Sequence, residues 1–290
     1  MMSGWIFIIL TSFCSVLLAH LFKIVEHTEA RTTAVLTVNY AFATLIALLI
    51  SLRNPEAVNG FFSAEPLTIF LGIITGVVFI VNFFAYTKSV YLNGVGVSVA
   101  AMRVSLLIPV LLSTIWYLEP LLLRQWAGVI LVFLALILLL PNKKNLLNKK
   151  LSAGWLLVVL FILTGFGDSA LKIYEVDFSE VIGKELFMAI VFFTAFITGL
   201  IYFLSTHRGF FTKKEIWLGF CIGLPNLLTA IFLIAALEVM NGAVVYSAVN
   251  VLTVLGGTLL GLIRWKDSYT RLQLLGILFT IISVLLLIES

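Results

Sequence analysis

Long apolar stretches alternate with short polar breaks along the whole chain of 290 residues. A helix that crosses a lipid bilayer needs about 20 mostly apolar residues, and the chain contains ten stretches of this kind. They run from Gly4 to Phe22, Thr33 to Leu52, Leu67 to Thr87, Val95 to Tyr117, Leu121 to Leu140, Ala153 to Leu171, Leu186 to Leu204, Ile216 to Leu237, Ala243 to Ile263 and Leu272 to Ile288. The alternating pattern of membrane β-strands is absent. We therefore expect an all-α polytopic membrane protein with ten transmembrane helices.

The composition excludes most classes of soluble protein. Hydrophobic residues make up 62% of the chain and charged residues 11%, with a mean hydropathy of +1.17. Because soluble proteins carry about 25% charged residues, neither a soluble fold nor a nucleic-acid-binding protein is expected. Cys14 and Cys221 lie inside apolar stretches, where we expect buried thiols rather than a disulfide or a metal site. The first stretch lacks a basic segment and a cleavage site, so we interpret it as a retained helix.

The second half of the chain resembles the first half when the two are aligned at a spacing of 148 residues. The matches include residue types that are scarce in so apolar a chain. They are Asn93-Gly94 with Asn241-Gly242, Gln125 with Gln273, Gly128 with Gly276, Glu119 with the similar Asp267 and, after a shift of one residue, Lys23 with Lys172. We predict two five-helix repeats, residues 1–148 and 149–290. Because five is an odd number, the second repeat enters the membrane from the opposite side, which makes the repeat inverted.

Glycine, proline and acidic residues at repeat-related positions have mainly structural interpretations. The pairs Gly72/Gly76, Gly219/Gly223 and Gly257/Gly261 have the spacing of close helix packing, which we favour over a functional role. Pro109 and Pro225 interrupt helical hydrogen bonds inside apolar stretches, either as gating kinks or as tolerated bends. Glu119 and Asp267 occupy equivalent hairpin tips, where a carboxylate beside the next helix N-terminus is favourable, so we interpret both as structural.

Lysine and arginine are distributed unevenly between the two sides of the predicted membrane topology. The basic side holds Arg31, Lys143, Lys144, Lys149, Lys150, Arg208, Lys213, Lys214, Arg264, Lys266 and Arg271, whereas the other side holds Arg53, Arg124 and Lys184. Connections rich in lysine and arginine stay in the cytoplasm. The bias therefore predicts an inner (plasma) membrane protein with both termini outside.

A polar helix face recurs at equivalent positions of the two repeats. Tyr246, Asn250 and Thr253 lie on one face of the ninth stretch, because three or four residues separate them. Their counterparts in the fourth stretch are Ser98, Met102 and Ser105, and the third stretch carries Asn82 and Tyr86 on one face. Small polar residues in membrane helices often serve helix contacts. A packing role and a solute-binding role therefore both remain open.

Three charged residues lie inside apolar stretches, where a charge is costly and functional by default. Arg103 lies deep in the fourth stretch, and Asp168 and Lys172 lie four residues apart on one face of the sixth. Asp168 and Lys172 form either a local ion pair or contacts to solute, and Arg103 either pairs with Asp168 across the halves or binds solute. We predict that Arg103 binds an anionic group, a carboxylate in particular, because the guanidinium fork matches it.

Each predicted repeat ends in an acidic hairpin tip that is followed nine residues later by a glycine, Glu119 to Gly128 and Asp267 to Gly276. Together with ten predicted helices in two copies of five, this pattern resembles the EamA-like branch of the drug/metabolite transporter superfamily over essentially the whole chain. The resemblance implies a secondary transporter of small metabolites with a central cavity between the halves. Two features depart from the usual pattern, since Leu118 and Lys266 replace the glycine of each tip and the predicted orientation is reversed.

We expect a secondary transporter that moves small polar metabolites, amino-acid-like or other anionic or zwitterionic solutes, by alternating access. A passive pore or a lipid flippase with the same fold is the alternative. An enzyme or a primary pump is not expected, because the chain lacks a metal-binding His-Glu-x-x-His motif and a phosphate-binding loop. Neither a cofactor nor a metal is expected, and the oligomeric state stays open, with a monomer compatible. The predicted solute-binding residues are Asn82, Tyr86, Arg103, Asp168, Lys172, Tyr246, Asn250 and Thr253.

Overall fold

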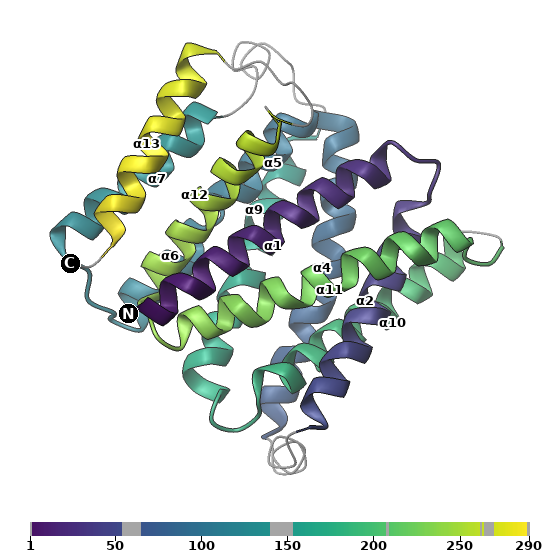
Figure 1. The fold of residues 1–290 in the computed structure, drawn as a ribbon. Helices are drawn as coiled ribbons and strands as arrows, with labels where there is room; N and C mark the ends of the chain where they lie inside the picture. Colours follow the sequence, from purple (N-terminus) through teal and green to yellow (C-terminus); the bar gives the residue numbers. More distant parts are fainter. Residues whose placement is uncertain are drawn as a thin grey trace.

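The structure, a computed structural model, describes residues 2–53, 65–139, 153–206, 209–261, 263 and 270–288, and these residues form helices and no strands (Figure 1). In chain order the helices are α1 (Met2–Glu26), α2 (Thr32–Ser51), α4 (Pro66–Asn93), α5 (Val95–Val104), α6 (Leu107–Leu111), the π-helix η1 (Leu112–Trp116), α7 (Leu123–Leu139), α9 (Trp155–Ile173), the π-helix η2 (Tyr174–Phe178), α10 (Lys184–Thr206), α11 (Lys213–Leu237), α12 (Gly242–Leu260) and α13 (Arg271–Leu287). The predicted tip at Lys266 and Asp267 and the basic residues Lys143, Lys144, Lys149, Lys150, Arg208 and Arg264 lie outside the described residues.

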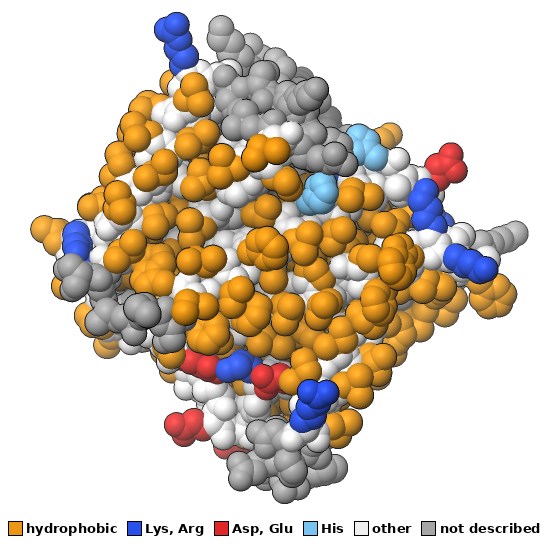
Figure 2. Space-filling view, viewed as in Figure 1, with side chains coloured by type: hydrophobic (Ala, Val, Ile, Leu, Met, Phe, Trp, Pro, Cys, Tyr) orange, Lys and Arg blue, Asp and Glu red, His pale blue; other side chains and the backbone are white. Residues whose placement is uncertain are grey.

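The helices of the described chain have the length and composition of membrane spans. Eight segments are long and apolar enough to cross a bilayer, and α7 and α13 are shorter apolar helices. Figure 2 shows hydrophobic side chains across the middle of one face, with charged side chains at its margins. Phe13, Ile130 and Leu204 are 64%, 58% and 66% exposed, as expected for side chains that contact lipid rather than water. The prediction of a multi-pass helical membrane protein is therefore confirmed.

Contacts between the two halves of the chain dominate the packing. The helix α2 packs against α10 and α11, α4 packs against α9 and α10, and α1 packs against α11 and α12. At one edge of the molecule α7 lies along α13 (Figure 1). Each of these pairs joins residues 1–148 to residues 149–290. The two halves are therefore interleaved, and helices from both halves surround the middle of the bundle.

The helix connections meet at two ends of the bundle, named end A and end B here. At end A, Glu119 accepts a hydrogen bond from the backbone nitrogen of Gly242 at the start of α12, at 2.7 Å. Gly4 near the start of α1 contacts Met240 at the same end. At end B, Arg31 in front of α2 binds Glu215 in the first turn of α11. The α1 helix therefore runs from end A to end B.

Two glycine pairs allow α4 and α11 to approach their neighbours closely. A Cβ built on Gly72 would lie 2.9 Å from Ile190 Cγ2 on α10, and one built on Gly219 would lie 2.6 Å from Val38 Cβ on α2. The second glycine of each pair meets the backbone of the same facing helix; these are Gly76 and Gly223. A larger residue at any of these positions would force the helices apart, so the close packing predicted from the spacing is confirmed for these two pairs. The prediction is wrong for Gly257 on α12, because a Cβ built there meets no atom within 4 Å.

The fourth apolar stretch is broken in the middle, and the break explains where Arg103 lies. Pro109 has no N–H to donate to the carbonyl of Ser105, which instead accepts from Ile108 N at 2.9 Å. The helix α5 consequently ends at Val104, and Arg103 occupies its last turn, where a cation is favourable. Pro225 has no such effect, because α11 continues through it.

Candidate functional site

A cavity of about 450 Å³ lies in the middle of the bundle between α1, α4, α5, α9, α11 and α12. Its volume falls within the range of about 300 to 1,000 Å³ that is usual for ligand pockets. Six of the eight predicted solute-binding residues line it: Tyr86, Arg103, Asp168, Tyr246, Asn250 and Thr253. The polar face predicted for the ninth stretch therefore lines a cavity to which both halves of the chain contribute. Of the face predicted for the fourth stretch only Met102 lines it, because the Ser98 hydroxyl contacts Ser89 and the Gly94 carbonyl instead.

Arg103 enters the cavity from the first half and meets a neutral partner from the second half. Its Nη1 atom donates a hydrogen bond to Asn250 Oδ1 at 3.0 Å. The Asn250 amide nitrogen donates to the Tyr246 carbonyl oxygen at 3.2 Å, which turns the Asn250 oxygen toward the guanidinium. Among the described residues, no carboxylate lies within ion-pair distance of Arg103. Asp168 interacts with the guanidinium electrostatically, but not at contact distance.

Asp168 brings a negative charge to the same cavity from α9. Its backbone oxygen accepts a hydrogen bond from Tyr246 Oη at 2.7 Å, which ties α9 to α12. Its carboxylate lines the cavity without a hydrogen bond or ion pair to any side chain of the described part of the chain. Neither the Arg103–Asp168 pair nor the Asp168–Lys172 pair considered from the sequence is formed at ion-pair distance. One cation and one anion therefore face a shared space and attract each other without forming a contact ion pair.

Two buried hydroxyl groups on the cavity wall also lack hydrogen-bond partners within the described residues. They are Thr11 Oγ1 on α1 and Thr253 Oγ1 on α12. Buried polar atoms are nearly always satisfied in native proteins, so an unsatisfied pair on one cavity wall suggests groups that are satisfied by bound solute or water. The sequence interpretation included Thr253 and missed Thr11, whose repeat counterpart is the apolar Leu160.

Asn82 and Tyr86 lie at the border of a second chamber. This chamber has a volume of about 310 Å³ and lies between α1, α2, α4, α5 and α11. Tyr86 and Met102 line both spaces, and Asn82 Nδ2 donates a hydrogen bond to Thr164 Oγ1 of the central cavity wall at 3.0 Å. The two predicted residues on α4 therefore form part of the wall that separates the chamber from the cavity.

Lys172 lies outside the cavity, in a cluster of charges at end A. Its Nζ atom is 2.6 Å from Glu119 Oε1 and 2.6 Å from Glu175 Oε2, and the residue is 1% exposed. The nitrogen also lies 6.0 Å from the centre of the Tyr117 ring. The other Glu119 oxygen accepts from Gly242 N, so its carboxylate caps α12 rather than the next helix, α7. The cluster joins three parts of the chain that are distant in sequence: the segment at Glu119, the end of α9 with η2, and the start of α12.

The position of Ser105, predicted on a polar helix face, has a local explanation. Its hydroxyl donates to the carbonyl oxygen of Met102 and does not line the cavity.

Ser15 and Thr164, which line the cavity but were not predicted, occupy equivalent positions in the two predicted repeats. That shared small polar character was the available signal for them. The described residues contain no group of three or more His, Cys, Asp or Glu side chains that could hold a metal ion.

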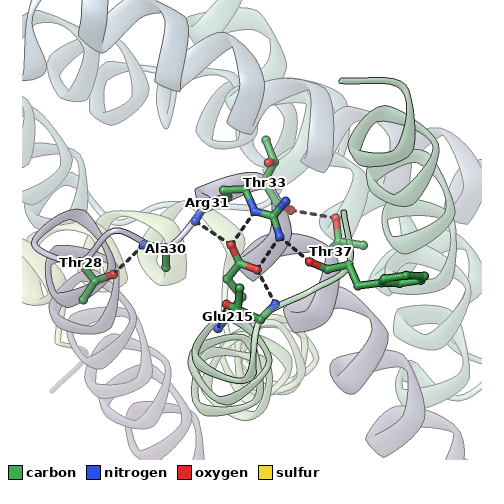
Figure 3. Close-up of polar contacts among 8 residues, drawn as sticks. Thr28, Ala30, Arg31, Thr33, Thr37 and Glu215 are labelled. Atoms are coloured by element: carbon green, nitrogen blue, oxygen red, sulfur yellow. Dashed lines mark hydrogen bonds and ion pairs between the residues drawn. The ribbon is translucent and has the colours of Figure 1, made fainter. Parts of the chain in front are cut away.

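A second, partly buried charge cluster lies at end B (Figure 3). Arg31 Nε donates to Glu215 Oε1 at 2.7 Å and Arg31 Nη2 to Glu215 Oε2 at 2.8 Å, in a two-pronged contact. Glu215 also accepts from the backbone nitrogen of Thr212, completing a capping box at the start of α11. The sequence interpretation treated Arg31 as a loop charge. It did not predict this contact, because Arg31 and Glu215 are far apart in sequence.

Comparison with known proteins agrees with the fold and leaves function open. No family model matches the chain. A protein of Haemophilus influenzae that is described as uncharacterized is 25% identical over 281 residues, which cover 93% of each chain. A crystal structure described only as that of a protein superposes with a TM-score of 0.74 at 11% identity, covering 96% of this chain and 95% of the other. At that identity the likeness shows a shared fold alone.

Proposed function

We propose that this protein is a secondary transporter of small zwitterionic or anionic metabolites, of the EamA-like branch of the drug/metabolite transporter superfamily. The observation that carries the proposal is the pair of opposite charges, Arg103 and Asp168, that line one cavity between the two halves without forming a contact ion pair. A charge inside a membrane helix costs at least about 2.5 to 3.5 kcal/mol on insertion scales, so its retention calls for a partner. A bound solute provides such a partner for both charges.

The two charges match the two ends of an amino-acid-like solute. A guanidinium binds a carboxylate through parallel N–H donors, and Arg103 uses only one donor group for Asn250 in this structure. Asp168 is suited to accept hydrogen bonds from an ammonium group, and the unsatisfied Thr11 and Thr253 hydroxyls are suited to polar groups between the ends. Solutes with a carboxylate but no ammonium group fit Arg103 alone and should bind less tightly.

An inverted repeat is part of the proposal, and reciprocal contacts support it. A Cβ built on Gly128 of α7 would lie 3.1 Å from Leu287 Cγ of α13, and one built on Gly276 of α13 would lie 2.9 Å from Leu139 Cγ of α7. Exchanging each residue for the one 148 positions away converts one contact into the other. The contacts of the glycine pairs on α4 and α11 have the same reciprocity, because α4 meets α10 as α11 meets α2.

Residues at equivalent repeat positions also face each other across the cavity. The lining includes Ser15 and Thr164, Ala19 and Asp168, Tyr86 and Leu233, and Met102 and Asn250. This arrangement is expected when the cavity lies on the axis that relates two inverted copies, which is where such transporters bind solute. The charges themselves are asymmetric, since alanine is the counterpart of Asp168 and Val251 is the counterpart of Arg103.

Ligand binding to purified protein tests the proposed site. A zwitterionic amino acid, its N-acetyl derivative and its decarboxylated amine serve as probes, with binding followed by the shift in thermal unfolding. We expect Arg103→Gln and Asp168→Asn each to weaken binding of the zwitterion about 10- to 100-fold while the protein stays folded. Arg103→Lys should restore little, and Lys184→Gln, at end A outside the cavity, is the matched control. If Arg103→Gln unfolds the protein and Asp168→Asn restores it, Arg103 is structural.

Reconstitution into lipid vesicles separates a carrier from the alternatives with the same fold. A carrier shows saturable uptake and exchange of labelled solute for unlabelled solute. A passive pore dissipates the gradient without saturation, and a flippase moves labelled lipid instead. Either of these last two results would contradict the proposed function.

We also propose that end A faces outward and end B faces the cytoplasm of an inner (plasma) membrane protein. The proposal rests on the loop charges, because the connections at end B carry most of the lysine and arginine. In a protein without Cys14 and Cys221, a cysteine at exposed Glu180 of end A should react with an impermeant reagent outside intact cells. A cysteine at exposed Lys213 of end B should be shielded, and the reverse labelling would invert the topology.

A further inference from the structure

The chamber beside the central cavity has a chemistry of its own. Most of its wall is aromatic or aliphatic, with five rings contributed by Phe22, Tyr40, Phe79, Phe83 and Tyr86. The ring centres of Phe22 and Phe83 are 5.7 Å apart, and those of Phe83 and Tyr86 are 6.4 Å apart. An apolar cavity of about 150 Å³ already accommodates benzene, so the chamber, at about 310 Å³, has room for a larger group that contains a ring.

One polar atom on this apolar wall has no partner. Asn39 on α2 is 0% exposed and lines the chamber. Its Oδ1 atom accepts a hydrogen bond from Asn226 Nδ2 at 3.3 Å, whereas its own Nδ2 atom donates to no atom of the described residues. Leaving a buried donor unsatisfied is costly. A bound group that supplies an acceptor at this point would remove that cost.

Helix packing explains the Asn39 oxygen, which binds Asn226 of α11, but not the unsatisfied amide nitrogen. The contact of Gly223 with the backbone of Asn39 corresponds in the other half to the contact of Gly76 with the backbone of Val191. Val191 is also 0% exposed, so the equivalent position is filled by an apolar residue in an equally buried place. The asymmetry between the two halves therefore points to a role for Asn39 in binding.

We infer that the chamber is a specificity site for the side chain of the transported solute, and that it takes a bulky apolar group that ends in a hydrogen-bond acceptor. The inference rests on the proposed function, because the charged head of the same solute is assigned to Arg103 and Asp168. Tyr86 and Met102 line both spaces, so a solute with its head in the central cavity reaches the chamber past these two residues. Asn39 Nδ2 then donates to the acceptor at the end of the side chain.

The first arm of the test compares zwitterions that differ only in the side chain. Equilibrium binding of L-tyrosine, L-phenylalanine and L-alanine to the purified full-length protein is measured. L-Tyrosine should bind most tightly and L-alanine least, because only the phenol oxygen reaches the Asn39 donor and the methyl group leaves the chamber empty. If wild-type protein binds the three alike, or prefers L-alanine, the inference is wrong and the proposed function still stands.

Asn39→Leu, which keeps the shape of the side chain and removes the donor, forms the second arm. The preference for L-tyrosine over L-phenylalanine should fall about tenfold, while L-phenylalanine binding stays within about twofold of the wild type. Thr37→Val is the matched control, because it removes a buried hydroxyl of the same helix whose hydrogen bond goes to the Thr33 carbonyl, and neither residue lines the chamber. An equal loss for both ligands in Asn39→Leu would assign the amide a structural role and overturn the inference.

Probes without a charged head separate the chamber from the proposed transport site. Binding of p-cresol and toluene is measured with wild type and Asn39→Leu, and the ratio of their dissociation constants should change about tenfold between the two proteins. If the preference for p-cresol over toluene depends on Asn39 and no zwitterion binds, the binding role of the chamber is supported and the proposed function is contradicted. If neither p-cresol nor any zwitterion binds, both are overturned.

Discussion

The fold pairs the charges at end A with one another, but among the described residues it leaves the charges of the central cavity without a contact ion pair. Lys172 is 1% exposed and has a carboxylate oxygen on each side at 2.6 Å, from Glu119 and Glu175. Arg103 and Asp168 are half-buried, face one cavity and form no contact ion pair with any of the described residues. Burying a charge is costly in both places. At end A carboxylates of the protein offset that cost at contact distance, whereas in the cavity we propose that a bound solute offsets it.

This difference separates charges that the protein pairs itself from charges that we propose bind solute. The end A cluster ties the connection after η1 to η2 and to the start of α12. Under the proposed function these contacts must separate during a transport cycle, because alternating access requires that one end opens while the other is closed. Stability measurements on single variants therefore test the comparison directly.

The largest effect is expected from Lys172→Met. This change leaves Glu119 and Glu175 buried beside each other without a cation, and breaking a buried pair in this way costs about 3 to 5 kcal/mol of unfolding free energy. Equilibrium unfolding in mixed detergent measures the loss. Lys184→Met is the control, because Lys184 and Glu238 pair at 2.8 Å with side chains 24% and 33% exposed, and it should cost less than about 1 kcal/mol. Equal losses would remove the distinction between the two pairs.

An intermediate effect is expected from Glu215→Gln at end B. The Glu215 side chain is 2% exposed but Arg31 is 26% exposed, so solvent weakens the pair compared with the end A cluster. We expect a loss of about 1 to 2 kcal/mol in the same unfolding assay. Lys213→Gln, an exposed neighbour in the same helical turn, should change stability by less than about 0.5 kcal/mol. A loss from Glu215→Gln as large as that from Lys172→Met would contradict the ranking.

The smallest effect on stability is expected from Arg103→Met. Removing a charge that has no carboxylate partner should leave the unfolding free energy unchanged or raise it by up to about 1 kcal/mol, as at other sites where function opposes stability. Ligand binding should be lost in the same variant, which separates the two readouts. A loss of more than about 2 kcal/mol would mean that Arg103 has a structural partner and would weaken the comparison on which the solute site rests.

Much of the fold was predictable from the order of residues, because the bilayer leaves few alternatives. Backbone groups in lipid have to be satisfied within the segment, so an apolar stretch such as Thr33 to Leu52 has to be a helix, and α2 covers Thr32–Ser51. Helical periodicity also placed Tyr246, Asn250 and Thr253 on one face, and all three line the cavity.

The sequence did not predict the break after Arg103 as such. It identified Pro109 as a possible kink, but the end of α5 at Val104 depends on how the freed Ser105 carbonyl is satisfied. The structure resolves this with a bond from Ile108 N. A proline within an apolar stretch has either outcome, as the unbroken α11 around Pro225 shows.

The sequence by itself determined the helices and their polar faces, and the tertiary structure decided which charges meet. Asp168 and Lys172 share a helix face, yet Lys172 is bound by Glu119 from a connection more than fifty residues away along the chain. Asn39 did not stand out in the sequence, because only the packing of α2 against α11 leaves its amide unsatisfied in a chamber. Periodicity fixes the direction of a side chain relative to its own helix. Its partner depends on how neighbouring helices pack, which no local pattern specifies.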